Sequence, residues 1–217
     1  MDAFMAHLNK ANEALGKKIC EALLSNGYKS AVYAATASEA LEAASGLIPD
    51  AVSVGIPGTV TVRQMGFFER LEGKGCRVIH HWDPSLTPEA KNERLTEENA
   101  ADWFVTSSNA ITYDGIMVNI DGTGNRVAAM AWGPGKILFV VGINKAARDL
   151  DSAIMRVRDA ATPPNTMRVS INTPCVELGY CTNCSSPQRV CRVLLILERA
   201  PFGREAHVIL VGESLGY

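Results

Sequence analysis

The chain has 217 residues, of which 47% are hydrophobic and 20% charged, and its formal net charge is −2. This length supports one sizeable core, so we expect a single domain over residues 1–217. A net charge so close to zero does not indicate a nucleic-acid-binding protein, which is usually strongly basic. No apolar run approaches the roughly 20 residues that span a bilayer. No basic region followed by an apolar stretch opens the chain, so we expect no secretory signal and a cytoplasmic location.

Helix and strand patterns alternate through the first half of the chain. Apolar residues recur every three or four positions from Phe4 to Leu23, which predicts an amphipathic helix that Gly27 closes. N-terminal capping patterns predict further helices that begin at Thr36, Thr61 and Thr87. The first of these should end near Pro49 and the second near Leu71. Short apolar runs predict strands at 30–34, 51–54 and 76–79.

The second half continues the alternation. Apolar runs predict strands at 103–106, 116–120, 137–141, 193–197 and 207–211. A helix is expected from about Lys145 to Ala160, ended by Pro163 and Pro164. Strands that alternate with helices of this length indicate an α/β fold with a mainly parallel sheet flanked by helices.

Four of the six cysteines lie within seventeen residues, in a segment over 173–192. Their spacing is C-x5-C-x2-C-x6-C, formed by Cys175, Cys181, Cys184 and Cys191. In a reducing compartment such a cluster indicates metal binding before disulfides, and four thiolates suit tetrahedral zinc or a [4Fe–4S] cluster. A single C-x2-C turn with two outlying cysteines favours iron–sulfur over zinc, and four unconnected thiols remain the plain alternative. Cys20 and Cys76 fit buried apolar positions.

A second group of polar residues is predicted where parallel strands end, the edge at which open α/β sheets bind ligands. Loops after three strands could supply hydrogen-bond donors and one ammonium group to a small anionic ligand. The alternative is that Asp121-Gly122 forms only a hairpin turn. The predicted ligand-binding residues are Gly58, Thr59, Thr61, Asn109, Thr112, Asp121, Gly124, Asn125 and Lys145.

His80 and His81 follow the strand predicted at 76–79 and precede Trp82 and Asp83. A histidine beside a carboxylate can transfer protons, so the pair could line the same crevice. Surface loops carry such residues routinely, and the sequence does not decide between these interpretations.

Several long motifs resemble the LUD-domain family, which is associated with lactate utilization. They are VGIPGTVTVRQMG, SSNAITYDGIMVNIDGTGNRVAAMAWGP, VVGINK, the four-cysteine segment after NTPC, and HVILVGESLGY at the end. The resemblance covers nearly the whole chain, from Leu15 to Tyr217, and is to short members with a C-terminal cysteine segment. It implies a fold of the type shared by sugar-phosphate isomerases and coenzyme A transferases.

The resemblance also qualifies the chemistry. The stretch from Asn109 to Ala131 is similar to a segment of methylthioribose-phosphate isomerase-like proteins that follows an active-site aspartate, but here Ser107-Ser108-Asn109 stands in that region. Isomerase chemistry is therefore not expected, although the crevice could be kept for binding.

In the lactate system, related domains accompany iron–sulfur and oxidase-like subunits. The resemblance therefore implies a redox or electron-transfer role. Such a protein could act with redox partner subunits, and it could form a homo-oligomer. The alternatives are a metal-dependent enzyme, or a small-ligand-binding module with a structural zinc site.

Overall fold

The computed structural model describes residues 3–217, so Met1 and Asp2 lie outside the described residues. The strands are β1 (Ser30–Ala34), β2 (Ser53–Gly55), β3 (Arg77–Ile79), β4 (Trp103–Thr106), β5 (Ala110–Thr112), β6 (Met117–Asp121), β7 (Lys136–Gly142), β8 (Ala146–Ala147), β9 (Val193–Leu197) and β10 (Ala206–Val211). The α-helices are α1 (Ala3–Ser25), α2 (Ala37–Leu47), α3 (Val60–Gln64), α4 (Phe67–Gly73), α5 (Pro88–Ala100), α6 (Asn125–Ala131), α7 (Leu150–Arg156), α8 (Thr162–Arg168) and α9 (Pro174–Leu178). A 3-10 turn, η1 (Ile143–Lys145), and a π-helical turn, η2 (Val157–Ala161), complete the set.

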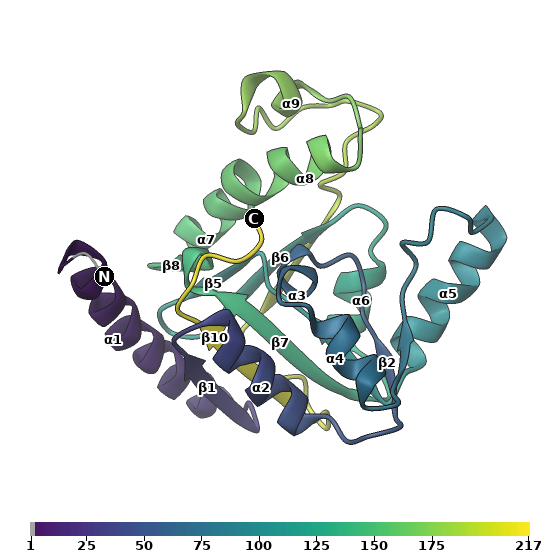
Figure 1. Cartoon of the computed structure of the whole chain (residues 1–217). Coiled ribbons are helices and arrows are strands. Elements are labelled where there is room, and N and C mark those ends of the chain that lie inside the picture. The colour runs from purple at the N-terminus through teal and green to yellow at the C-terminus, as the bar shows by residue number, and fades with distance from the viewer. Residues whose placement is uncertain (1–2) are drawn as a thin grey trace.

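A six-stranded sheet forms the centre, in the order β1-β10-β7-β4-β2-β3. All its pairings are parallel, which confirms the expected α/β fold with a mainly parallel sheet. The central strands β7 and β10 are buried along almost their whole length, as strands covered by helices on both faces must be. Figure 1 shows α2, α3 and α4 in front of this sheet.

Alternate residues of the central strands feed two separate cores. In β7, Ile137 and Phe139 pack toward α1 and α6, whereas Leu138 and Val140 pack toward α2, α3 and α4. This is the period of two that a pleated strand imposes on its side chains. Because both cores share one sheet, they agree with a single domain, which stays a prediction.

A smaller mixed sheet, in the order β8-β5-β6-β9, lies beside the main one. Strand β6 is antiparallel to both β5 and β9. The last two strands of the sequence therefore lie in different sheets, because β9 pairs in the small sheet and β10 pairs in the main one. A third apolar cluster fills the space between this sheet and α7, and includes Val118, Ala153 and Val157.

The capping prediction at Thr61 is wrong, while those at Thr36 and Thr87 are confirmed. The hydroxyls of Thr36 and Thr87 accept backbone N–H groups three residues on, at 3.2 Å each. The helix predicted over 61–71 instead begins at Val60, places Thr61 inside its first turn, and breaks into α3 and α4. The break falls at Gly66, which has the left-handed φ of 66° that glycine adopts without strain.

Pro163 and Pro164 do not end the preceding helix, contrary to prediction. The helix begins at Leu150, later than the predicted Lys145, and continues through η2 into the end of α8. The two prolines lack the N–H groups that would bond to the preceding turn, and the chain widens into the π-helical turn directly before them. The Thr162 hydroxyl donates to the Val157 carbonyl at 2.8 Å and so satisfies one acceptor of that turn.

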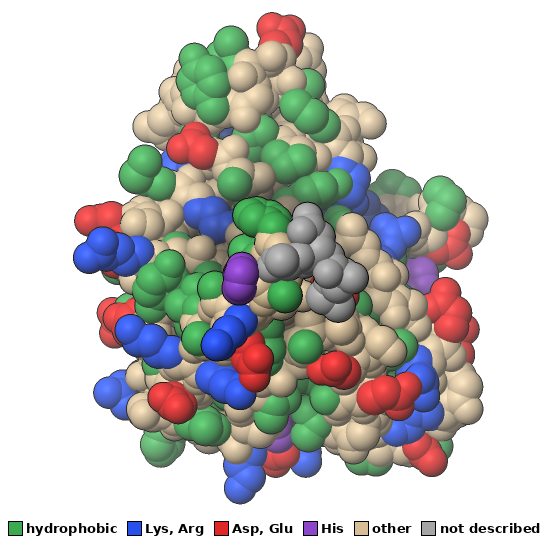
Figure 2. All heavy atoms as spheres, turned by 60° about the vertical axis from the view of Figure 1, so that its left-hand side comes forward, with side chains coloured by type: hydrophobic (Ala, Val, Ile, Leu, Met, Phe, Trp, Pro, Cys, Tyr) green, Lys and Arg blue, Asp and Glu red, His purple; other side chains and the backbone are tan. Residues whose placement is uncertain are grey.

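The outer surface combines charged side chains of both signs with scattered apolar ones. Figure 2 shows positive and negative side chains interspersed over the described part of one face, and apolar side chains on the projection at its top. That projection contains α9, as Figure 1 shows. Among residues 3–217, no helix combines the length and the apolar character that crossing a membrane requires.

Candidate functional site

A cavity of about 440 Å³ lies beyond the carboxyl ends of the parallel strands. Segments that follow β2, β3, β4, β7 and β10 all reach it, as do the junction between β6 and α6 and the side of α8. This is the edge at which the sequence predicted a site, because parallel strands bring the loops after them together.

Lys145 is the buried cation of this cavity. It follows β7, its residue is only 3% exposed, and its ammonium donates to the Thr61 hydroxyl at 2.7 Å and the Ser107 hydroxyl at 2.9 Å. Both partners are neutral, so no countercharge offsets the loss of hydration. Burial, together with the nearby Arg156 and Arg126 charges, lowers the pKa of Lys145 to about 7.

Arg126 forms the second cationic centre, at the start of α6. Its guanidinium donates to the side-chain oxygen of Asn109 at 3.0 Å and to the Ile120 carbonyl at 2.6 Å. The carboxylate of Asp121 lies 3.7 Å from its Nε and also accepts the Arg126 backbone N–H at 3.1 Å. Asp121 therefore fixes the strand-to-helix junction and orients the guanidinium.

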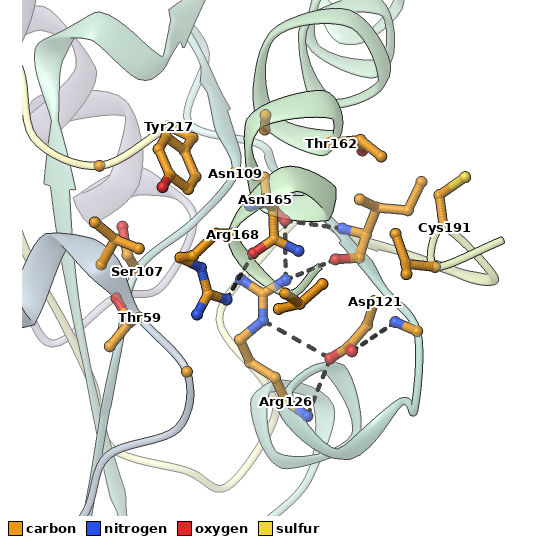
Figure 3. A pocket seen from close by; sticks show the side chains of 18 of the residues that line it. Thr59, Ser107, Asn109, Asp121, Arg126, Thr162, Asn165, Arg168, Cys191 and Tyr217 are labelled. Carbon is orange, nitrogen blue, oxygen red and sulfur yellow. Dashed lines mark hydrogen bonds and ion pairs between the residues drawn. The ribbon is translucent and has the colours of Figure 1, made fainter. Parts of the chain in front are cut away.

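Arg168, from the end of α8, adds a third cationic group. Its guanidinium donates to the Asn165 side chain at 2.7 Å. Burial lowers the pKa of Arg126, and the charge of Arg168 lowers it further. Figure 3 shows the guanidinium groups of Arg126 and Arg168 beside each other, between Thr59 and Ser107 on one side and Asp121 on the other. Among residues 3–217, the Lys and Arg side chains that line the cavity are Lys91, Arg126, Lys145 and Arg168, against one carboxylate side chain, Asp121.

A histidine–carboxylate pair stands at another part of the wall. The Nδ1 of His81 lies 2.7 Å from a carboxylate oxygen of Glu98, a residue of α5 that is 1% exposed. Burial raises the pKa of Glu98, against the opposing effect of the His81 hydrogen bond. Of the two histidines considered from sequence, His81 lines the cavity, whereas His80 packs against the rings of Phe68 and Trp82.

The segment after β10 closes one side of the cavity. Asn144 holds it by accepting the Leu215 N–H at 3.1 Å and donating to the Gly216 carbonyl at 3.3 Å. Gly216 has a φ of 64°, and a Cβ added there would lie 3.0 Å from the Lys145 nitrogen. Gly216 therefore lets the backbone pass directly over the buried lysine, and Tyr217 also lines the cavity.

Most of the predicted ligand-binding residues come together around this cavity, and two do not line it. Thr112 is buried in β5, where its hydroxyl bonds to Asp114 and accepts the Ile116 N–H. Gly124 precedes α6 in the left-handed conformation, with φ 91°, and its two neighbours Thr123 and Asn125 line the cavity instead. The predicted residues that line the cavity are Gly58, Thr59, Thr61, Asn109, Asp121, Asn125 and Lys145.

The hairpin interpretation of Asp121-Gly122 is wrong. Strand β6 runs into α6 rather than into a neighbouring strand, and Asp121 accepts the backbone N–H of Gly122 at 2.7 Å. Arg126 and Arg168 were not among the predicted site residues. Arginines in helices usually face solvent, so their sequence positions alone carried no signal that the fold would turn them toward one cavity.

The four cysteines of the segment are free thiols with separate contacts. Cys175 is buried on α9, and its sulfur lies 3.2 Å from the Thr173 hydroxyl. The sulfur of Cys181 accepts the Asn183 N–H at 3.3 Å, while Cys191 lines the cavity. Within residues 3–217, no three His, Cys, Asp or Glu side chains gather as a metal site would require, so this conformation does not fit a bound zinc ion or iron–sulfur cluster.

The side chain of Arg189 holds the second half of the cysteine segment by bonding to the backbone of that segment. Arg189 donates to the carbonyls of Cys184 and Cys191, at 2.9 Å each. The first half is tied to η2, since the Cys181 N–H donates to the Asp159 carboxylate at 3.0 Å. Hydrogen bonds to the backbone therefore hold both cysteines of the C-x2-C turn in place.

Comparison with known proteins identifies related sequences and folds. The family model of the LUD domain matches residues 17–211. A DUF162 family protein from Deinococcus radiodurans aligns over 92% of this chain and 97% of its own, with 13% identity and a TM-score of 0.49. The translation initiation factor eIF-2B from Pyrococcus horikoshii OT3 aligns over 51% of this chain and 46% of its own, with 15% identity and a TM-score of 0.35. Among curated proteins, none matches this sequence.

Proposed function

The chain belongs to the LUD domain family, which is associated with lactate utilization, and we propose that its cavity binds a small organic acid through the carboxylate. The observation that carries this proposal is the group of Arg126, Arg168 and Lys145 at one cavity, in which the two side-chain partners of Lys145 are neutral hydroxyls. A buried charge without a countercharge is unfavourable, and an anionic ligand would supply the missing charge.

The neighbouring arginines support the same ligand class. Arg126 and Arg168 stand close enough to repel each other, and a carboxylate between them would convert that repulsion into attraction. Hydroxyl and amide groups of Thr59, Ser107 and Asn125 line the rest of the wall and suit the hydroxyl or carbonyl oxygen of such an acid.

Titration calorimetry with lactate and with pyruvate tests the proposal. We expect saturable binding of at least one acid, and a loss of roughly 10- to 150-fold in affinity for Arg168→Gln, because a charge-assisted hydrogen bond contributes about 1.5–3 kcal/mol. Arg77→Gln is the matched control, since Arg77 is exposed at the start of β3 and pairs with Glu97 outside the cavity. Equal affinity in all three proteins, or no binding of either acid, would contradict the proposal. Tighter binding of inorganic phosphate would reassign the ligand class.

We propose as a second candidate that the cysteine segment binds a [4Fe–4S] cluster, or zinc, and gives the protein a redox role beside the acid site. Cys191 supports a link between the two, because it lines the same cavity as Asp121 and Arg126. Binding requires the segment to rearrange and bring its thiols together. Metal analysis and a visible spectrum of protein purified without oxygen test this candidate, since a cysteine-bound cluster absorbs broadly near about 400 nm.

A further inference from the structure

Lys145 has the surroundings of a reactive amine. Most buried lysines that serve structure are paired with a carboxylate, whereas Lys145 bonds to the hydroxyls of Thr61 and Ser107. Lys145 also lines the cavity, together with Thr61 and Ser107, the two residues whose hydroxyls hold its nitrogen. A lysine held this way, in an apolar or cationic setting, matches the environment in which amines act as nucleophiles on carbonyl groups.

We propose that Lys145 forms an imine with the carbonyl carbon of a small oxo acid, an inference that rests on the proposed binding of organic acids in this cavity. The amine nitrogen bonds to the carbonyl carbon, and a proton moves from nitrogen to oxygen to give a carbinolamine. The remaining nitrogen proton then passes to the hydroxyl oxygen, the carbon–oxygen bond breaks and water leaves, and the nitrogen electron pair forms the carbon–nitrogen double bond. No oxidant or reductant is consumed.

The cationic side chains place such a substrate with its carbonyl at the amine. Figure 3 shows the Arg126 and Arg168 guanidinium groups beside each other on the side of the cavity that Ser107 borders, and the Ser107 hydroxyl is a partner of Lys145. A carboxylate held by Arg126 and Arg168 would direct the adjacent carbonyl carbon toward Lys145. The oxo acids whose carbonyl neighbours the carboxylate are therefore the substrate class that fits.

The two hydroxyls supply the proton transfers. The oxygens of Thr61 and Ser107 lie 2.7 and 2.9 Å from the lysine nitrogen, within reach of the proton that must pass to the carbonyl oxygen. Burial and the neighbouring arginines hold the pKa of Lys145 at about 7, so near neutral pH a large share of the amine is unprotonated. An ordinary surface lysine is almost entirely protonated at that pH.

Reductive trapping with pyruvate tests the inference. We expect borohydride added to the protein with pyruvate to fix one adduct per chain, and peptide mapping to locate it at Lys145. Trapping should increase as pH rises through about 7, because only the neutral amine attacks. Lys145→Met should abolish the adduct, while Lys136→Met, at an exposed lysine paired with Glu205, should keep it.

The mapping on the unmodified protein decides the question even if Lys145→Met fails to fold. A folded protein with no adduct, or with adducts spread over exposed lysines, would overturn the inference. Lactate has no carbonyl carbon to attack at that position, so its calorimetric binding reports the acid site alone. Lactate binding without a Lys145 adduct would overturn the imine and leave the proposed function standing. No saturable binding of either lactate or pyruvate, together with no adduct, would overturn the proposed function and the imine with it.

Discussion

At the scale of single residues, Lys145 and Asp121 show how the same prediction can lead to different roles. Both were predicted to contact a ligand. Lys145 presents a buried nitrogen with neutral partners, whereas the Asp121 oxygens are already taken up by the backbone N–H groups of Gly122, Arg126 and Val127. Asp121 thus acts as a positioning residue for Arg126. The cavity keeps an excess of positive charge.

The lowered pKa of Lys145 predicts a pH-dependent stability. Between pH 7 and about 10.5 the unfolded chain binds a proton that the folded protein does not, so the free energy of unfolding rises with pH in this window. The contribution is up to about 1.4 kcal/mol per pH unit, and the full cost is present below pH 7. Urea unfolding of the wild type and Lys145→Met at pH 7, 8 and 9 measures it. The wild type should gain stability relative to the variant at each step, and parallel profiles would contradict the lowered pKa of Lys145.

At the scale of elements, most strands could be predicted closely, β5 and β8 were missed, and the helices were predicted less well. β1, β4 and β9 have the predicted bounds, because short apolar runs between polar turns allow little alternative. The helix at 61–71 and the end set at Pro163 were wrong, because Gly66 breaks a helix pattern that looks continuous and a π-helical turn accommodates two prolines. The loops at the strand ends were predictable from topology. The part of the cavity lining that α8 supplies was not predictable, because it depends on how α8 packs in the folded protein.

The contact between β2 and α5 carries a prediction at this scale. A Cβ at Gly55 would overlap the backbone carbonyl of Glu98, so β2 and α5 approach closely only because residue 55 is glycine. Gly55→Ala should destabilise the protein by about 1–3 kcal/mol, the usual cost of overpacking. Gly46→Ala is the matched control in α2, where an added Cβ meets nothing within 4 Å and a gain of up to about 1 kcal/mol is expected. Thermal melting of both variants checks this, and a Gly55→Ala protein as stable as wild type would exclude the close approach.

At the scale of the whole molecule, the cavity exists only in the assembled fold. Its lining comes from segments between Gly58 and Tyr217, and the cysteine segment closes the side near Asp121. The Arg192 N–H donates to the Asp121 carbonyl at 2.9 Å, which joins the end of that segment to the strand-to-helix junction. A rearrangement of the segment would therefore act at the edge of the cavity, through Cys191 and its neighbours.

Four single Cys→Ser variants test the proposed metal site. Cys181 and Cys184 share one tight turn, so replacing either should remove the metal. Cys175 and Cys191 lie at opposite ends of the segment, and their loss should lower both metal content and melting temperature, because binding and folding free energies are coupled in such sites. We expect all four variants to be affected, and Cys20→Ala and Cys76→Ala, at buried cysteines outside the segment, to keep their metal.

The readouts are iron and zinc per chain in protein purified without oxygen, together with thermal melting. Stoichiometric zinc in a colourless wild type would replace iron–sulfur with the zinc alternative. Loss of metal from three variants and its retention in one outlying variant would show that this cysteine is not a ligand, which would agree with a centre open toward the cavity. A wild type without metal, or four variants with full metal content and unchanged melting, would leave the cysteines as ordinary thiols in a segment whose backbone is held by Arg189 and Asp159.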